Sequence, residues 1–241
     1  MQLTVLGCAG SYGSPMGGAC SGYLVRGGGA LVWVDCGNGT FAQLQQHTAV
    51  EDLDAVVITH EHPDHCVDIY GLHVLLRYGL ERTRFPVYAP PGAEKRLGAL
   101  VTDWGDAFAW NVVGDDDRTT VGGIDLRFSR TDHPPPTYGV ELRADGKRLV
   151  YTADTGPDWS VGAFGAGADL VLSEATYQDR KPVPWHLTAR EAGAAAREAD
   201  ARRLVLTHLW PTLDPVVSAW EGSEAFGAPV TLAAPHLVME V

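Results

Sequence analysis

The chain has 241 residues, with 18 Lys plus Arg against 30 Asp plus Glu, and therefore a formal net charge of −12. A protein that grips many nucleic-acid phosphates needs a basic surface, so this charge argues against a stable nucleic-acid complex. A polybasic membrane-binding surface is not expected either. A small anionic substrate remains compatible, because a bound metal can dominate the local field.

No feature of a secreted or membrane-inserted protein is evident. The N-terminus lacks a basic start and a long apolar stretch, and no apolar run of about 18 residues occurs. The four cysteines have no C-x-x-C spacing, so we expect reduced thiols: Cys8, Cys20, Cys36 and Cys66. We predict a soluble, cytoplasmic protein. Because no repeat or linker interrupts the chain, we expect a single domain over residues 1–241.

Strands and helices alternate along most of the chain. Short apolar runs rich in β-branched residues predict strands at Leu3–Leu6, Leu31–Asp35, Ala55–Thr59, Leu149–Thr152, Leu170–Ser173 and Leu204–Thr207. Gly-rich residues 7–22 and 27–29 are typical of loops, and helical patterns lie near residues 39–47, 66–78, 93–103 and 188–199. Thr188 and Glu191 form a capping box ahead of the last helix. Residues 119–152 indicate short strands, with a hairpin signal at 144–147. This mixture predicts an α/β protein with mixed sheets.

The most informative stretch is His60-Glu61-His62-Pro63-Asp64-His65, directly after the apolar run that ends at Thr59. Imidazole and carboxylate are ligands that divalent cations such as zinc prefer. In a loop that leaves a strand, His60 and His62 can face one site while Asp64 and His65 turn toward another. A merely solvated His-rich loop is the alternative, and the spacing after a buried strand makes it the weaker interpretation.

Further candidates lie just after other predicted strands: His133, Asp154, Glu174 and His208. Functional groups gather at the carboxyl ends of strands in α/β sheets. Each residue alone is equally well explained as a cap or a core histidine. Together with the four candidates of the His-rich loop, His133, Asp154 and His208 supply seven metal ligands, enough for two metals that share a carboxylate.

The chain resembles the metallo-β-lactamase-fold hydrolases over nearly its whole length, starting at Leu6-Gly7 and Val34-Asp35-Cys36-Gly37. Within that superfamily it resembles the phosphodiesterase branch that includes ribonuclease Z. The motifs are Ser173-Glu174-Ala175-Thr176, His186-Leu187-Thr188 and Leu206-Thr207-His208. Its size and Gly-Cys-Ala-Gly-Ser start are most similar to compact bacterial cyclic-nucleotide phosphodiesterases. The fold that this resemblance implies is a four-layer αββα sandwich.

The resemblance also implies a binuclear metal site. It places His60, His62 and His133 on one metal, Asp64, His65 and His208 on the other, and Asp154 between them. Zinc is the expected metal, and manganese is the alternative, because the same ligand set accepts both. Two metals roughly 3.5–4 Å apart can hold a bridging hydroxide at neutral pH and clamp a phosphoryl oxygen.

Asp64, His186 and Glu174 are the expected catalytic side chains. Asp64 can bind one metal through one oxygen and orient or deprotonate the nucleophile with the other. His186 is the candidate donor of the proton that a leaving alkoxide needs, and related enzymes pair it with Glu174. A nearby helix N-terminus would lower the pKa of His186, whereas the Glu174 carboxylate would oppose that shift. A polar tether between strand and helix is the alternative role for this pair.

We therefore expect a metal-dependent hydrolase, and within that class a phosphodiesterase for a small anionic substrate such as a cyclic nucleotide. A lactone, thioester or other ester is the alternative, although relatives that cleave such bonds often lack the Glu174/His186 pair. Processing of tRNA 3′ ends is disfavoured, because ribonuclease Z enzymes carry a long arm where His133 to Asp154 leaves room for one hairpin. A non-catalytic or flavin-linked protein is disfavoured by the complete ligand set and the lack of a flavin domain. Homodimerisation is expected from the family alone.

Other side chains are assigned structural roles. Cys66 is expected to pack rather than to bind metal, and three histidines outside the motif are expected to be structural or at the surface: His47, His73 and His236. Four tryptophans are expected in the core or in contacts rather than in a base pocket: Trp104, Trp110, Trp159 and Trp185. The Gly-rich stretch 7–22 allows close backbone approach to a substrate.

Overall fold

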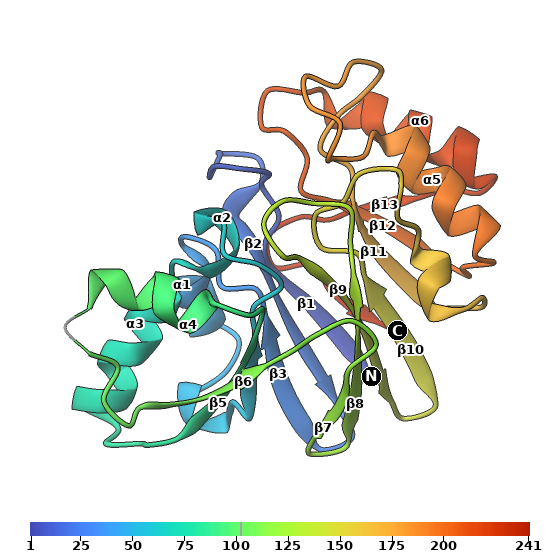
Figure 1. Ribbon diagram of the computed structural model, residues 1–241. Helices are drawn as coiled ribbons and strands as arrows, with labels where there is room; N and C mark the ends of the chain where they lie inside the picture. Colours follow the sequence, from blue (N-terminus) through green and yellow to red (C-terminus); the bar gives the residue numbers. More distant parts are fainter. Residues whose placement is uncertain (102) are drawn as a thin grey trace.

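The computed structural model describes residues 1–101 and 103–241. Across these residues two mixed, seven-stranded sheets pack face to face, with helices on both outer faces (Figure 1). The first sheet has the strand order β14 (Val238–Glu240), β1 (Gln2–Gly7), β2 (Gly18–Gly27), β3 (Ala30–Val34), β4 (Ala55–Val57), β5 (Phe85–Ala89) and β6 (Phe108–Val112).

The second sheet has the strand order β13 (Thr231–Leu232), β12 (Leu204–Thr207), β11 (Leu170–Glu174), β10 (Lys147–Tyr151), β9 (Tyr138–Ala144), β8 (Ile124–Arg130) and β7 (Arg118–Val121). Strands β10, β11 and β12 are parallel, and β9 is antiparallel to both β10 and β8. Strands β8, β10, β11 and β12 therefore end at the same edge of the sheet.

Helices cover the outer face of each sheet (Figure 1). The first sheet carries α1 (Thr40–Leu44), α2 (Pro63–Cys66), α3 (Ile69–Val74) and α4 (Ala93–Leu97), and the second carries α5 (Ala189–Glu198) and α6 (Pro215–Phe226). One apolar cluster fills the space between the sheets, and two others lie beneath the two helical layers. The expected four-layer αββα sandwich is confirmed. Among the described helices none is long and apolar enough to cross a membrane.

Most of the predicted elements are found. Each predicted strand matches an observed one within about two residues at either end. Thr188 Oγ1 accepts from the Glu191 N–H at 3.1 Å, and the Glu191 carboxylate accepts from the Thr188 N–H at 2.8 Å, which confirms the capping box. Asp145 and Gly146 have φ angles of 55° and 69°, as a tight hairpin turn requires, and the turn joins β9 to β10. All four cysteines are free and buried.

Three predicted segments differ from the structure, and some elements were not predicted. The helix expected over 66–78 is divided, because the Asp68 N–H donates to Cys36 O at 2.8 Å instead of continuing the helix that ends at Cys66. The helix expected over 93–103 ends at Leu97 and continues as a short turn, and residue 102 lies outside the described residues. The Gly-rich stretch 7–22 is not all loop, because β2 begins at Gly18. Strands β5 and β6 and helix α6 were not predicted.

Candidate metal centre

The expected ligands lie at strand ends that meet between the two sheets. The loop after β4 and the start of α2 carry the His-rich motif, so these ligands come from the first sheet. His133, Asp154 and His208 follow β8, β10 and β12 of the second sheet. Since those strands end at one edge, residues more than 140 positions apart in sequence come into contact there, such as Asp64 and His208. All seven expected ligands are brought together.

The first ligand group consists of His60, His62, His133 and Asp154. His60 Nε2 lies 3.0 Å from His62 Nδ1, and His133 Nε2 lies 3.3 Å from the same atom. These short distances show that the ring nitrogens converge. His60 and His133 are buried, so side chains shield that point from solvent. Three imidazole nitrogens and a carboxylate oxygen form a donor set that suits a divalent metal.

The second group consists of Asp64, His65 and His208. His208 Nε2 lies 3.3 Å from His65 Nε2 and 3.2 Å from Asp64 Oδ2. Asp154 lies between the groups, with Oδ2 3.7 Å from His60 Nε2 and Oδ1 3.3 Å from His65 Nε2. Asp154 Oδ1 is buried and accepts no hydrogen bond from any described residue. A buried carboxylate oxygen without a donor is costly unless a cation satisfies it, so the residues present fit a pair of bound metals.

The outer nitrogen of each buried imidazole has its own partner. The contacts are His60 Nδ1 with Thr59 Oγ1 at 3.2 Å, His65 Nδ1 with Asp35 Oδ2 at 2.7 Å, His133 Nδ1 with Trp185 O at 2.9 Å, and His208 Nδ1 with Thr176 Oγ1 at 2.8 Å. Carbonyl and carboxylate partners can only accept, so at least His65 and His133 carry their proton on Nδ1. Their Nε2 atoms then face the cluster, where each would present a lone pair to a bound metal.

Electrostatics favours a cation at this position. Burial lowers the pKa of His60, His62 and His133, so these rings are neutral and able to donate lone pairs. Burial also opposes a charge on His65, but the carboxylates of Asp154, Asp35 and Asp64 outweigh it and raise the pKa of His65 well above its usual value. The buried carboxylates thus favour a positive charge at this position. Divalent metals would supply it.

Asp35 also belongs to the site, although the sequence alone indicated no functional role for it. It is fully buried and accepts from the Thr59 N–H at 2.8 Å, from the Tyr151 hydroxyl at 3.0 Å and from His65 Nδ1. Its φ of 56° lies in the left-handed region, where Asp is tolerated better than most residues. Its position at the carboxyl end of β3 was the available signal.

Glu174 and His186 form the expected pair. His186 Nδ1 lies 3.1 Å from Glu174 Oε1, and Glu174 also accepts from the Thr155 N–H and the Thr176 hydroxyl, each at 2.6 Å. His186 lies 3.9 Å from Asp154 Oδ2, beside the ligand cluster. Burial lowers the pKa of His186, but the Glu174 carboxylate, followed by Asp154, raises it to about 9. The pKa of this ring is therefore shifted in the direction predicted for the carboxylate.

The remaining candidates lie outside the cluster. The Cys66 thiol donates to His62 O at 3.1 Å and is buried. His73 packs edge-on against Trp104 in the core, and His47 and His236 contact each other at 2.9 Å. Trp104 is a core residue, whereas Trp110 and Trp159 are half-buried and Trp185 is exposed. The Gly-rich loop reaches the site itself, because the Ser11 N–H donates to Asp64 Oδ2 at 3.0 Å.

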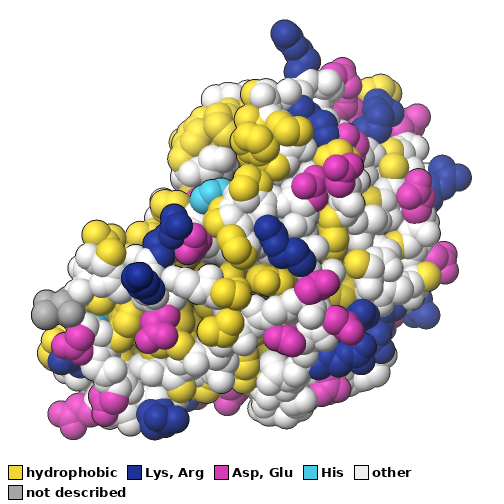
Figure 2. All heavy atoms as spheres, viewed as in Figure 1, with side chains coloured by type: hydrophobic (Ala, Val, Ile, Leu, Met, Phe, Trp, Pro, Cys, Tyr) yellow, Lys and Arg dark blue, Asp and Glu magenta, His cyan; other side chains and the backbone are white. Residues whose placement is uncertain are grey.

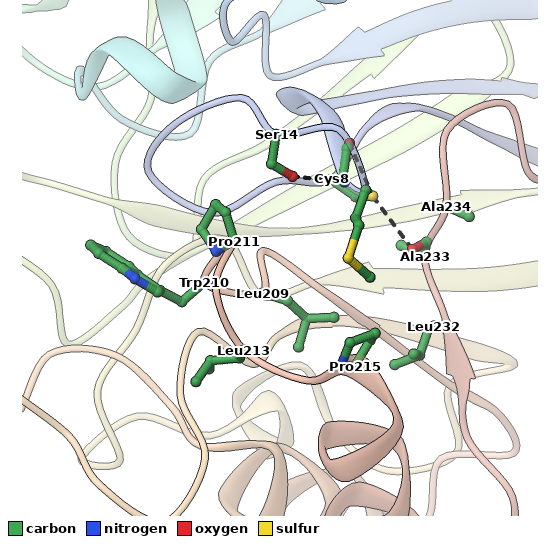
Figure 3. A pocket seen from close by; sticks show the side chains of 12 residues that line it. Cys8, Ser14, Leu209, Trp210, Pro211, Leu213, Pro215, Leu232, Ala233 and Ala234 are labelled. Carbon is green, nitrogen blue, oxygen red and sulfur yellow. Dashed lines mark hydrogen bonds between the residues drawn. The ribbon is translucent and has the colours of Figure 1, made fainter.

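A separate apolar cavity of about 220 Å³ lies next to the segment that follows His208, because Leu209 and Trp210 line it (Figure 3). Side chains of Leu209, Pro215 and Leu232 surround it, and the Cys8 thiol donates to Ala233 O at 3.4 Å at its wall. None of the seven candidate ligands lines this cavity.

Two mixed sheets between helical layers, with a buried His/Asp cluster at the strand ends, define a metal-dependent hydrolase. The chain belongs to the beta-lactamase superfamily, because the family model described as a beta-lactamase superfamily domain matches residues 31–209. The fold is the metallo-β-lactamase fold, as the resemblance predicted.

Individual relatives agree with this assignment. The chain is 33% identical over 219 residues to the probable metallo-hydrolase YhfI of Bacillus subtilis, covering 87% of each protein. The crystal structure of YhfI has a TM-score of 0.89 at 30% identity and covers 100% of this chain and 98% of its own. A ribonuclease Z of Mycobacterium bovis is 28% identical over 250 residues, 89% of this chain and 88% of the relative. A diphosphatase from the PhnP family has a TM-score of 0.79 at 23% identity over 100% of this chain and 97% of its own, which shows the fold alone.

Proposed function

We propose that the protein is a phosphodiesterase that hydrolyses a small anionic phosphodiester, such as a cyclic nucleotide, with two divalent metals, most readily zinc. The observation that carries the proposal is the Glu174/His186 pair beside Asp154. Cleavage of an alkyl phosphodiester expels an alkoxide, which needs a proton, and a protonated imidazole held by a carboxylate can deliver one. Cleavage of a thioester expels a thiolate, which needs no such donor.

The seven clustered side chains would hold the metals. His60, His62 and His133 would bind one ion, Asp64, His65 and His208 the second, and Asp154 both. Two divalent ions bound there would stabilise the charge on a phosphoryl oxygen and promote the ionisation of water. Manganese remains the alternative, because the donor set does not discriminate strongly between the two metals.

The protein's own residues handle the protons. Burial raises the pKa of Asp64, but His65 and His208 outweigh it and lower the pKa, so this carboxylate stays ionised and can orient or deprotonate an attacking water. The Ser11 N–H occupies Asp64 Oδ2 and restrains its orientation. Since the pKa of His186 is about 9, the ring is protonated at neutral pH. Glu174 holds its Nδ1–H, which leaves the Nε2–H to be donated to the leaving alkoxide.

The shape and charge of the protein support a small substrate. The segment between His133 and Asp154 contains only the β9–β10 hairpin with its flanking loops, so it supplies no long arm for tRNA. On the face seen in Figure 2, Lys and Arg side chains lie in small groups among Asp and Glu, with apolar areas between them. With a net charge of −12, such a surface favours a ligand held by the metals over a nucleic acid held by many phosphates. No stable nucleic-acid complex is expected, and a homodimer and a cytoplasmic location remain predictions.

The test is turnover of 3′,5′-cyclic AMP by zinc-loaded and manganese-loaded protein, followed by chromatography of the products. We expect 5′-AMP from the wild type and a loss of at least about 100-fold in His186→Ala, within the range that one proton donor contributes. Absence of turnover with both metals bound would exclude 3′,5′-cyclic AMP. If 2′,3′-cyclic phosphates also stay intact while a lactone or thioester is cleaved, the phosphodiesterase proposal is wrong and the ester alternative is right.

A further inference from the structure

We propose that Thr176 is a positioning residue whose single hydroxyl couples the candidate metal ligand His208 to the Glu174/His186 pair. Thr176 lies just beyond β11 and is fully buried. Its Oγ1 is 2.6 Å from Glu174 Oε2, 2.8 Å from His208 Nδ1 and 3.3 Å from His186 Nδ1. One oxygen therefore contacts both halves of the proposed machinery.

Counting protons determines the direction of these hydrogen bonds. Glu174 is surrounded by donors alone, which are the N–H groups of Thr155, Thr176 and Leu187, the ring of His186 and the Thr176 hydroxyl. Because every one of these neighbours can donate, the Glu174 oxygens act as acceptors. At 2.6 Å the Thr176 hydroxyl must donate its one proton to Glu174 Oε2, since otherwise two lone pairs would face each other at that distance.

The direction of these hydrogen bonds determines which ring nitrogen of His208 carries the proton. Having donated its proton, Thr176 Oγ1 can only accept from the ring at 2.8 Å, so His208 carries a proton on Nδ1. Its Nε2 lone pair then points toward His65 and Asp64, where a metal would bind. A hydroxyl can donate to a ring nitrogen or accept from it, so by itself it would leave the tautomer of His208 open. The hydrogen bond that Thr176 donates to Glu174 sets this tautomer.

The backbone keeps the hydroxyl in place. Thr176 O accepts from the Trp210 N–H at 3.1 Å, so the segment after β11 is tied to the segment that follows His208. A cation at His208 Nε2 would make its Nδ1–H a stronger donor, and the effect would pass through the hydroxyl to Glu174, because hydrogen bonds in a chain polarise one another. Metal binding and proton donation are coupled through one side chain.

The test compares Thr176→Val, which removes the hydroxyl at nearly constant shape, with Thr176→Ser, which keeps it. Thr40→Val is the matched control, because Thr40 is also fully buried and its hydroxyl donates to Gly37 O at 2.6 Å, away from Glu174 and His208. Metal affinity is measured by competition with a chelator. Turnover is measured with cyclic AMP, which expels an alkoxide, and with bis(p-nitrophenyl) phosphate, whose leaving group needs no proton.

We expect Thr176→Val to weaken zinc binding by about 10- to 100-fold, the usual effect of removing a partner of a metal-bound histidine. It should reduce cyclic AMP turnover more than nitrophenyl ester turnover, by at least about tenfold in the ratio. Thr176→Ser should restore both properties, and Thr40→Val should change neither. Unchanged affinity and an unchanged ratio in Thr176→Val, or a Thr176→Ser variant as impaired as the valine, would overturn the proposal.

A further readout uses the intact wild type and does not depend on its folding after mutation. Ring-nitrogen chemical shifts of the zinc-loaded protein should show His208 protonated on Nδ1, and a proton on Nε2 would contradict the proposal. Only the comparison of leaving groups rests on the proposed function. If the wild type fails to cleave cyclic AMP, metal affinity and the His208 tautomer still decide the role of Thr176.

Discussion

Arg130 and His133 are joined by two hydrogen bonds, in which Nη1 and Nη2 of Arg130 each donate to His133 O at 3.0 Å. Arg130 Nη1 also donates to the carbonyls of Thr131 and Thr137, at 2.8 Å and 3.1 Å. A single guanidinium therefore holds both ends of the proline-rich loop that carries a candidate ligand. Its planar set of donors matches several carbonyls at once, which a lysine ammonium cannot reproduce.

Arg130→Lys should consequently loosen the His133 loop. We expect about a tenfold loss of zinc affinity and a parallel loss of activity, measured by chelator competition and by turnover at saturating zinc. Arg127→Lys is the control, because Arg127 lies on the same strand and pairs with the exposed Asp116. Wild-type zinc affinity in Arg130→Lys would show that the prolines alone order the loop.

Asp35→Asn tests the partner of His65 with little change in shape. Asn tolerates the left-handed backbone of this position, so the fold should be kept. The amide removes the negative charge beside His65 and replaces one of the two acceptor oxygens with a donor, so zinc affinity should fall by about 10- to 100-fold. Isothermal titration of zinc into the metal-free protein measures this. Tyr151→Phe, which removes a different hydrogen bond to Asp35, should have a smaller effect.

The pH profile should report the Glu174/His186 pair. Because Glu174 raises the pKa of His186 to about 9, the donor is protonated below that pH and is lost as the pH rises through it. Turnover of an alkyl phosphodiester should therefore fall on the alkaline side. In Glu174→Gln the raising influence is removed, so the alkaline limb should move to lower pH. Initial rates between pH 6 and pH 10 for the two proteins test this, and superimposable limbs would assign the loss to another group.

Removing metal should destabilise the protein. Asp64 and Asp154 are largely or fully buried, and the possible cationic partners beside them are histidine rings. Bound divalent metals would interact more strongly with these carboxylates and so stabilise the folded state. When the free metal concentration is 100 times the dissociation constant, binding at one site increases the free energy of unfolding by about 2.7 kcal/mol. Thermal unfolding with and without a chelator should show a higher midpoint with zinc. Asp154→Asn should reduce that increase strongly, and an equal increase in the variant would contradict the bridging role.

The capping box of α5 gives a prediction about stability alone. Burial raises the pKa of Glu191, but Lys181, whose ammonium lies 2.6 Å from the carboxylate, and Thr188 outweigh it and lower the pKa below its ordinary value of 4.5. A lowered pKa adds stability above the unfolded value, and this contribution disappears as the pH falls through the folded one. Urea unfolding should show Glu191→Gln less stable than wild type at pH 7, with the gap closing below about pH 4.

The local sequence was sufficient to predict features whose residues lie close together along the chain. The candidate ligands between His60 and His65 lie within one loop and the following turn, and the α5 cap is set by residues three positions apart. Strand ends also indicated Asp154 and His208, since parallel strands bring their carboxyl ends to one edge.

Other features could not be predicted because they depend on distant contacts. The acceptor for His133 is the carbonyl of Trp185, and backbone atoms leave no signal in a sequence. The division of the helix near Cys66 arises from a bond to Cys36 in another loop. Helix α6 was missed although Asp214 caps it and Pro215 occupies its first turn, a recognisable helix start.

Both ligand groups take members from each sheet, with His60 and His62 joined by His133, and Asp64 and His65 joined by His208. During synthesis the His-rich motif leaves the ribosome more than 140 residues before His208 does. A nascent N-terminal half therefore offers only part of either coordination sphere, and neither ion has its full set of ligands until the two sheets have come together. Tight metal binding would then indicate that β12, the strand that His208 follows, has been placed correctly.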